Sequence, residues 1–124
     1  MRSSNRPLSP HLQVYKPQLT SMLSILHRIS GLLLALGLMF FVYWLYALAT
    51  DVAAANQFRD WLLTVPGQIG LYLWLFTFYY HFCNGIRHLR WDVGKGLAIE
   101  QVYRSGYTVL LLAVLLTVAT FLLA

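Results

Sequence analysis

Charged residues and cysteines are both scarce in this 124-residue chain. Only 10% of the residues are charged and only four are acidic, whereas 59% are hydrophobic and 15% are aromatic. One small soluble core cannot hide that much apolar surface, so the composition excludes an ordinary soluble domain. The single cysteine, Cys83, excludes both an internal disulfide and a cysteine-bound iron–sulfur cluster. Because no glycine-rich nucleotide loop is present either, we expect that the chain alone is not an enzyme.

Three continuous apolar runs are long enough to cross a membrane. They occupy about residues 24–49, 67–88 and 105–124, and a helix of roughly 20 residues spans a hydrocarbon core of roughly 30 Å. None of the runs shows the short alternating strands of a membrane β-barrel. The sequence therefore predicts an all-α integral membrane protein, in which residues 1–124 form one membrane-anchor domain. That domain has three transmembrane helices preceded by an N-terminal arm over residues 1–23.

Basic residues are unevenly distributed between the predicted loops. Four of them precede or open the first span and four lie between the second and third, whereas the first loop holds only Arg59. By the positive-inside rule, the N-terminal arm and the second loop lie on the cytoplasmic or matrix side. The net charge of +5 is therefore explained first by membrane topology and not by binding to nucleic acid. The arm lacks an Arg-rich amphipathic transit segment, so we expect a bacterial inner membrane rather than a mitochondrial one.

Polar side chains gather at the start of the first span. Ser24, His27 and Arg28 stand at positions i, i+3 and i+4, which places them on one helical face. Gly31 extends this face without adding side-chain bulk. A serine hydroxyl can hydrogen-bond a carbonyl and an arginine can stabilise negative charge developing on it, so the face suits a small polar headgroup. The alternative is an ordinary first turn with solvated polar residues and a snorkelling arginine.

His81 is an ionisable residue in the second apolar run, and such residues usually serve a function. A neutral imidazole can bind haem iron through one nitrogen while an acceptor, such as the backbone carbonyl of Thr77, holds its other N–H. Gly85, on the same face, leaves a flat space where a macrocycle fits against the backbone. His88 lies about 10 Å further along the helix axis, so the two histidines cannot ligate one iron from opposite sides.

Basic side chains also stand between His81 and the predicted inner interface. Arg28, Arg87 and His88 are placed to contact acidic groups such as haem propionates. The alternative for His81 is a hydrogen bond to a neighbouring helix with no cofactor present. Residue type and spacing leave both interpretations open.

Two longer motifs resemble those of a known family. The segments RPLSPHLQVYKPQLTSMLSILHRISG (6–31) and HFCNGIRHLRWDVG (81–94) are similar to the two signatures of the cytochrome b subunit of succinate dehydrogenase, or complex II. Each signature combines several residue types at fixed spacings. The S-x-x-H-R-x-S core begins at Ser24, and the H-x-x-x-G-I-R-H core begins at His81. The resemblance covers essentially the whole chain.

The resemblance implies a membrane-anchor subunit of succinate:quinone oxidoreductase. In that family a flavoprotein subunit oxidises succinate, an iron–sulfur subunit relays the electrons, and two small membrane subunits share one haem b and bind ubiquinone. Position by position, His81 matches the axial ligand of the haem iron, and Ser24 and Arg28 match the quinone site. His27 and His88 match positions near the haem propionates. The resemblance assigns the other axial histidine to the second anchor subunit.

Two alternatives to this function remain. The same fold serves as a fumarate reductase anchor in which menaquinol is the electron donor, and the quinone extracted with the purified complex would separate the two. The other alternative is a purely structural anchor or small helical channel without haem. A reduced-minus-oxidised visible spectrum would separate that protein from a cytochrome b.

Overall fold

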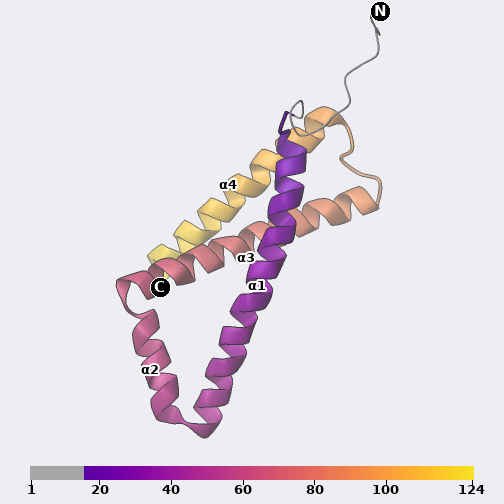
Figure 1. Ribbon diagram of the computed structural model, residues 1–124. Helices are drawn as coiled ribbons and strands as arrows, with labels where there is room; N and C mark the ends of the chain where they lie inside the picture. The colour runs from indigo at the N-terminus through magenta and orange to yellow at the C-terminus, as the bar shows by residue number, and fades with distance from the viewer. Residues whose placement is uncertain (1–15) are drawn as a thin grey trace, which may run out of the picture.

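The chain folds into helices throughout the part that the structure, a computed structural model, describes, which is residues 16–124 (Figure 1). The helices are α1 (Leu19–Thr50), α2 (Val52–Leu62), α3 (Val65–Asp92) and α4 (Ile99–Leu123). The predicted all-α class is confirmed. Of the predicted N-terminal arm, residues 1–15 lie outside the described residues, and the last part of it is already the first turn of α1.

Two of the helices qualify individually as membrane spans. α1 and α4 are long enough, and an 18-residue stretch of each has a mean hydropathy of 2.2 and 2.3, respectively. α3 qualifies only together with α2, and this pair is bent by 84° at the break between them. The described residues thus provide two spans, or three if the bent pair counts as one. The side of the membrane on which the N-terminus lies stays a prediction.

Helix α2 occupies the segment that the sequence analysis treated as the first loop. Asp51 caps its start by accepting a hydrogen bond from the backbone N–H of Ala54 at 3.1 Å. Thr64 likewise caps α3 by accepting from the N–H of Gly67 at 3.3 Å, with Pro66 in the first turn. Local capping therefore divides this region into two helices. The charged residues of this segment indicated that it is not a membrane span by itself. They did not indicate that it forms a helix.

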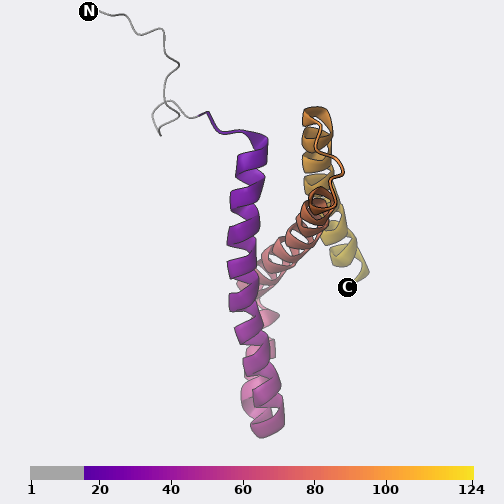
Figure 2. The ribbon, with the colours of Figure 1, turned by 90° about the vertical axis from the view of Figure 1, so that its right-hand side faces the viewer.

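The buried core lies where three helices meet. α1 crosses α3, and α4 packs along α3 (Figures 1 and 2). Leu23, Tyr80, Val109 and Ala113 form the buried cluster, and the Tyr80 hydroxyl donates to the backbone carbonyl of Leu23 at 2.7 Å. A Cβ on Gly106 would lie 2.8 Å from Leu23 Cδ1, so glycine is what lets α4 approach α1 here.

Most large apolar side chains of α1 and α4 are exposed in this single chain. Examples are Met39, Phe40 and Leu122, each more than half exposed. Apolar surface of this extent is not stable in water and needs lipid or another protein against it. The exposed helices therefore agree with a membrane setting.

Candidate functional site

Three histidines from two helices meet near the crossing of α1 and α3. The rings of His27 from α1 and His81 from α3 stack with their centroids 4.1 Å apart and only 10° between their planes. The His27 ring also lies 5.0 Å from the ring of His88, two turns further along α3. His27 thus contacts both α3 histidines. We call these three residues the histidine cluster.

The hydrogen bonds around His81 determine which of its ring nitrogens carries the proton. Ser30 Oγ donates its single proton to the backbone carbonyl of His27 at 2.7 Å and lies 2.9 Å from His81 Nδ1. That carbonyl, an acceptor only, is also 3.2 Å from His81 Nδ1. His81 Nδ1 must therefore be the donor to both oxygens. The neutral ring then carries its lone pair on Nε2, which makes no hydrogen bond to the described residues.

The structure corrects the expected acceptor for His81. The backbone carbonyl of Thr77 was the candidate on the same helix, but His81 Nδ1 reaches across to α1 instead. The expectation was wrong because the helix crossing brings Ser30 and the His27 carbonyl closer to the ring than any acceptor on α3. Ser30 is the last residue of the S-x-x-H-R-x-S core, and this motif was the sequence feature that could have identified Ser30 as a partner of His81.

Two glycines border the histidine cluster. A Cβ on Gly31 would lie 3.1 Å from His81 Cε1, which is closer than an ordinary van der Waals contact. The nearest atom to a Cβ on Gly85 would be His27 Cε1 at 3.9 Å. The backbone of α1 therefore lies directly against the His81 ring, and the space beside Gly85 is bordered by His27.

One polar atom in the histidine cluster is buried without a partner. His27 Nδ1 is inaccessible to solvent and makes no hydrogen bond with any described residue. Buried polar atoms in proteins are nearly always hydrogen-bonded, because leaving one unpaired costs free energy. His27 Nδ1 is therefore an unsatisfied polar atom in a ring that stacks on His81.

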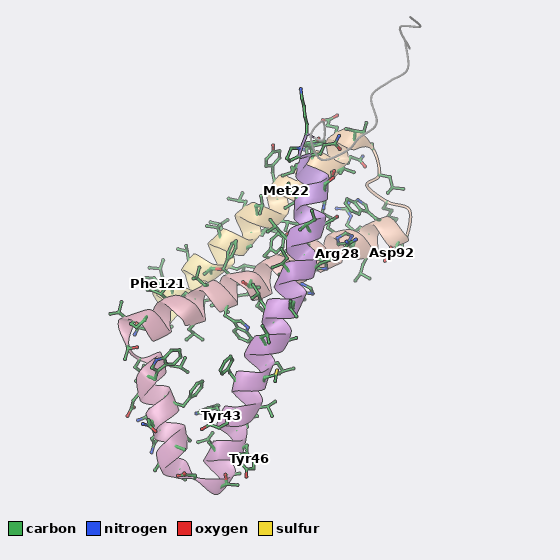
Figure 3. The ribbon with its side chains drawn as sticks, viewed as in Figure 1. Met22, Arg28, Tyr43, Tyr46, Asp92 and Phe121 are labelled. Atoms are coloured by element: carbon green, nitrogen blue, oxygen red, sulfur yellow. The ribbon has the colours of Figure 1, made fainter. Side chains whose placement is uncertain are left out.

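Ser24 and Arg28 lie on α1 next to the histidine cluster. Ser24 is half-buried and Arg28 is exposed, and neither side chain forms an ion pair or hydrogen bond with the described residues. Figure 3 shows Arg28 at the level where α1 crosses α3, with Asp92 at the end of α3 on the same side.

Arg87 points to the other side of α3, toward α4. It is only 4% exposed, and its guanidinium donates to Ser105 Oγ at 3.0 Å, Asn84 Oδ1 at 3.3 Å and the backbone carbonyl of Val102 at 3.1 Å. It also lies over the ring of Trp91 at 4.1 Å. Arg87 and His88 were both predicted to lie near the haem propionates, and the sequence did not indicate these partners of Arg87 on α3 and α4.

Comparison with known proteins matches the sequence of this chain to one family. The family described as "Succinate dehydrogenase/Fumarate reductase transmembrane subunit" matches residues 2–120. The chain is 44% identical over 128 residues to the succinate dehydrogenase cytochrome b560 subunit of Reclinomonas americana, covering 96% of this chain and 86% of that protein. It is 40% identical over 115 residues to the cytochrome b556 subunit of Rickettsia bellii, covering 93% and 90%. The mitochondrial cytochrome b560 subunit of Mus musculus is 46% identical over 115 residues, covering 91% and 68%.

Proposed function

Because the chain belongs to the family of succinate dehydrogenase and fumarate reductase transmembrane subunits, we propose that it is the cytochrome b membrane anchor of a succinate dehydrogenase. In this proposal it binds haem b and ubiquinone together with a second anchor subunit. Its cationic inner end docks the flavoprotein and iron–sulfur subunits. The compared relatives are named for succinate dehydrogenase, which favours this direction over fumarate reduction. The complex is the enzyme, and this chain supplies binding and electrostatics.

His81 is the proposed axial ligand, and the observation that carries the assignment is the position of its Nδ1 against Ser30 Oγ and the His27 carbonyl, from which its tautomer is inferred. Ser30 and the His27 carbonyl hold the proton on Nδ1 and leave the Nε2 lone pair free, as a histidine that ligates a metal requires. Haem, when bound, would accept and release single electrons. His88 is two turns away on the same helix and cannot be the second axial ligand, which the family resemblance assigns to the other anchor subunit.

The propionates of the haem are proposed to lie against the basic residues beside His81. His27 has the unpaired Nδ1, and His88 contacts the His27 ring. Arg28, the next residue after His27 on α1, is exposed. Arg87 stays a predicted member of this set, although three of its N–H groups already donate within the contact between α3 and α4.

Ubiquinone is proposed to bind at Ser24 and Arg28. The two residues are four apart on α1 and have no side-chain partner among the described residues. The Ser24 hydroxyl would donate a hydrogen bond to a quinone oxygen, and Arg28 would stabilise the negative charge that develops there during reduction. The overall chemistry is the transfer of two electrons and two protons to the quinone.

The membrane of residence is proposed to be a bacterial inner membrane. The compared relatives include a Rickettsia protein and a mouse mitochondrial protein, so the family occurs in both kinds of membrane. The choice of the bacterial membrane stays a prediction.

Affinity purification through this chain, followed by visible spectroscopy, tests the proposal. The complex should contain the flavoprotein, the iron–sulfur subunit and a second anchor, with low-spin b-type bands in the reduced-minus-oxidised spectrum. His81→Ala should weaken or abolish these bands, whereas His88→Ala should retain a low-spin signal. An unchanged spectrum in His81→Ala would refute the ligand assignment. A complete wild-type complex without b-type bands would identify a structural anchor instead.

A further inference from the structure

A cavity of about 500 Å³ lies between the C-terminal end of α3 and the start of α4. These two helix ends are joined by a short loop at one end of the molecule (Figure 1), and the loop turns at Gly94 and Gly96, whose φ angles are 73° and 79°. The histidine cluster does not line this cavity. We call it the α3–α4 cavity.

The walls of the α3–α4 cavity are cationic at the loop end. Four of the nine Lys and Arg residues of the chain line it, namely Arg87, Arg90, Lys95 and Arg104. No acidic residue lines it. The nearest acidic contact is an exposed pair between Arg104 and Glu100 at 4.0 Å, and exposed pairs of this kind offset little charge. The cavity therefore attracts an anion.

Arg87 makes this attraction specific because it is a buried charge without a counterion. Its three hydrogen-bond acceptors are all neutral oxygens, and no carboxylate of the described residues lies within 4.0 Å of it. Burying a charge costs several kcal/mol unless an opposite charge compensates it. The three hydrogen bonds and the Trp91 ring hold the guanidinium in one orientation. A fixed, uncompensated cation at the wall is what an anion site requires.

The cavity becomes apolar away from the loop. Ile86, Val109 and Leu112 form this part of the wall, and Leu112 lies about 12 Å along the helix axis from Arg104. α4 is one of the candidate membrane spans, so the apolar wall runs into the hydrocarbon while the cations stay at its edge. An amphiphile with an anionic head and an acyl chain matches both parts of the wall, whereas an acidic protein segment matches only the cationic part.

We propose that the α3–α4 cavity binds the phosphate headgroup of an anionic phospholipid, with one acyl chain against Ile86, Val109 and Leu112. Basic pockets between membrane helices bind lipid headgroups by this combination of charge and apolar contact. The lipid phosphate supplies negative charge on the α4 side of Arg87, where the described residues offer it only neutral acceptors. Its binding stabilises the junction of α3 and α4, because a ligand that binds only the folded state shifts the folding equilibrium.

The test uses the assembled complex, stripped of lipid in a neutral detergent and titrated with phosphatidylglycerol, phosphatidylcholine or inorganic phosphate. Phosphatidylglycerol should raise the midpoint of thermal unfolding more than either other probe does. In Arg90→Gln/Lys95→Gln, the concentration that gives half of this shift should rise about 30-fold, which corresponds to about 1 kcal/mol for each lost cation. The matched control Lys16→Gln/Arg59→Gln removes two exposed cations outside the cavity and should leave that concentration unchanged.

Three outcomes would overturn the proposal. The first is an equal response to phosphatidylcholine, or an unaltered phosphatidylglycerol titration in the cavity variant. The second is a full shift with inorganic phosphate alone, which would identify a free phosphate site. The third is release of the soluble subunits from the cavity variant with its lipid response intact, which would assign these cations to protein docking.

Discussion

Substitution of Gly31 by alanine tests whether the close approach of α1 to His81 matters for the haem site. The added Cβ would lie 3.1 Å from His81 Cε1, so the imidazole must move by a few tenths of an ångström. Overpacking of this kind costs about 1–3 kcal/mol, while replacing glycine by alanine inside a helix returns about 1 kcal/mol. We therefore expect a net loss of stability of up to about 2 kcal/mol. The displaced ring would also lengthen the 2.9 Å contact to Ser30.

Gly70 provides a matched control for this substitution. A Cβ on Gly70 would meet nothing within 4 Å. Gly70→Ala should therefore gain about 1 kcal/mol from helix propensity and leave the haem site unchanged. Haem content and the low-spin b-type spectrum of the purified complex report the site, and the thermal midpoint reports stability. If Gly31→Ala kept full haem content and was stabilised as much as Gly70→Ala, the inferred contact with His81 would not exist.

Four further substitutions test side chains of the candidate site and of the core. Ser30→Ala removes one acceptor from His81 Nδ1 but leaves the backbone carbonyl at 3.2 Å, so haem affinity should fall about tenfold to a hundredfold in a haem-release assay; unchanged release would contradict the role of Ser30. Ser24→Ala and Arg28→Leu should each slow quinone reduction tenfold to over a hundredfold, for a loss of about 1.5–3 kcal/mol, while succinate oxidation with a soluble acceptor persists. Equal loss of both activities would indicate failed assembly instead. Tyr80→Phe removes the buried hydrogen bond to α1 and should destabilise the complex by about 1 kcal/mol with an unaltered haem spectrum; a changed spectrum would show that Tyr80 reaches the site.

The fold class of the protein and the positions of its candidate residues on each helix were accessible from the sequence alone. Long apolar runs with few charges predict membrane helices because no other backbone arrangement here satisfies its hydrogen bonds in lipid. The spacing of Ser24, His27 and Arg28 places them on one face whatever the helix packs against. The separation of His81 and His88 likewise follows from helix geometry, so one iron cannot take both. These properties are local, and each depends on a single helix.

Contacts between helices were decided only by the tertiary structure. Helical periodicity does not show which face of α1 meets α3, so the sequence placed the partner of His81 on its own helix, whereas the crossing brings Ser30 to it. The same limit applied to Arg87, which lies one residue from His88 yet faces α4. Neighbouring positions on a helix point about 100° apart, and only the arrangement of the surrounding helices determines what each direction meets.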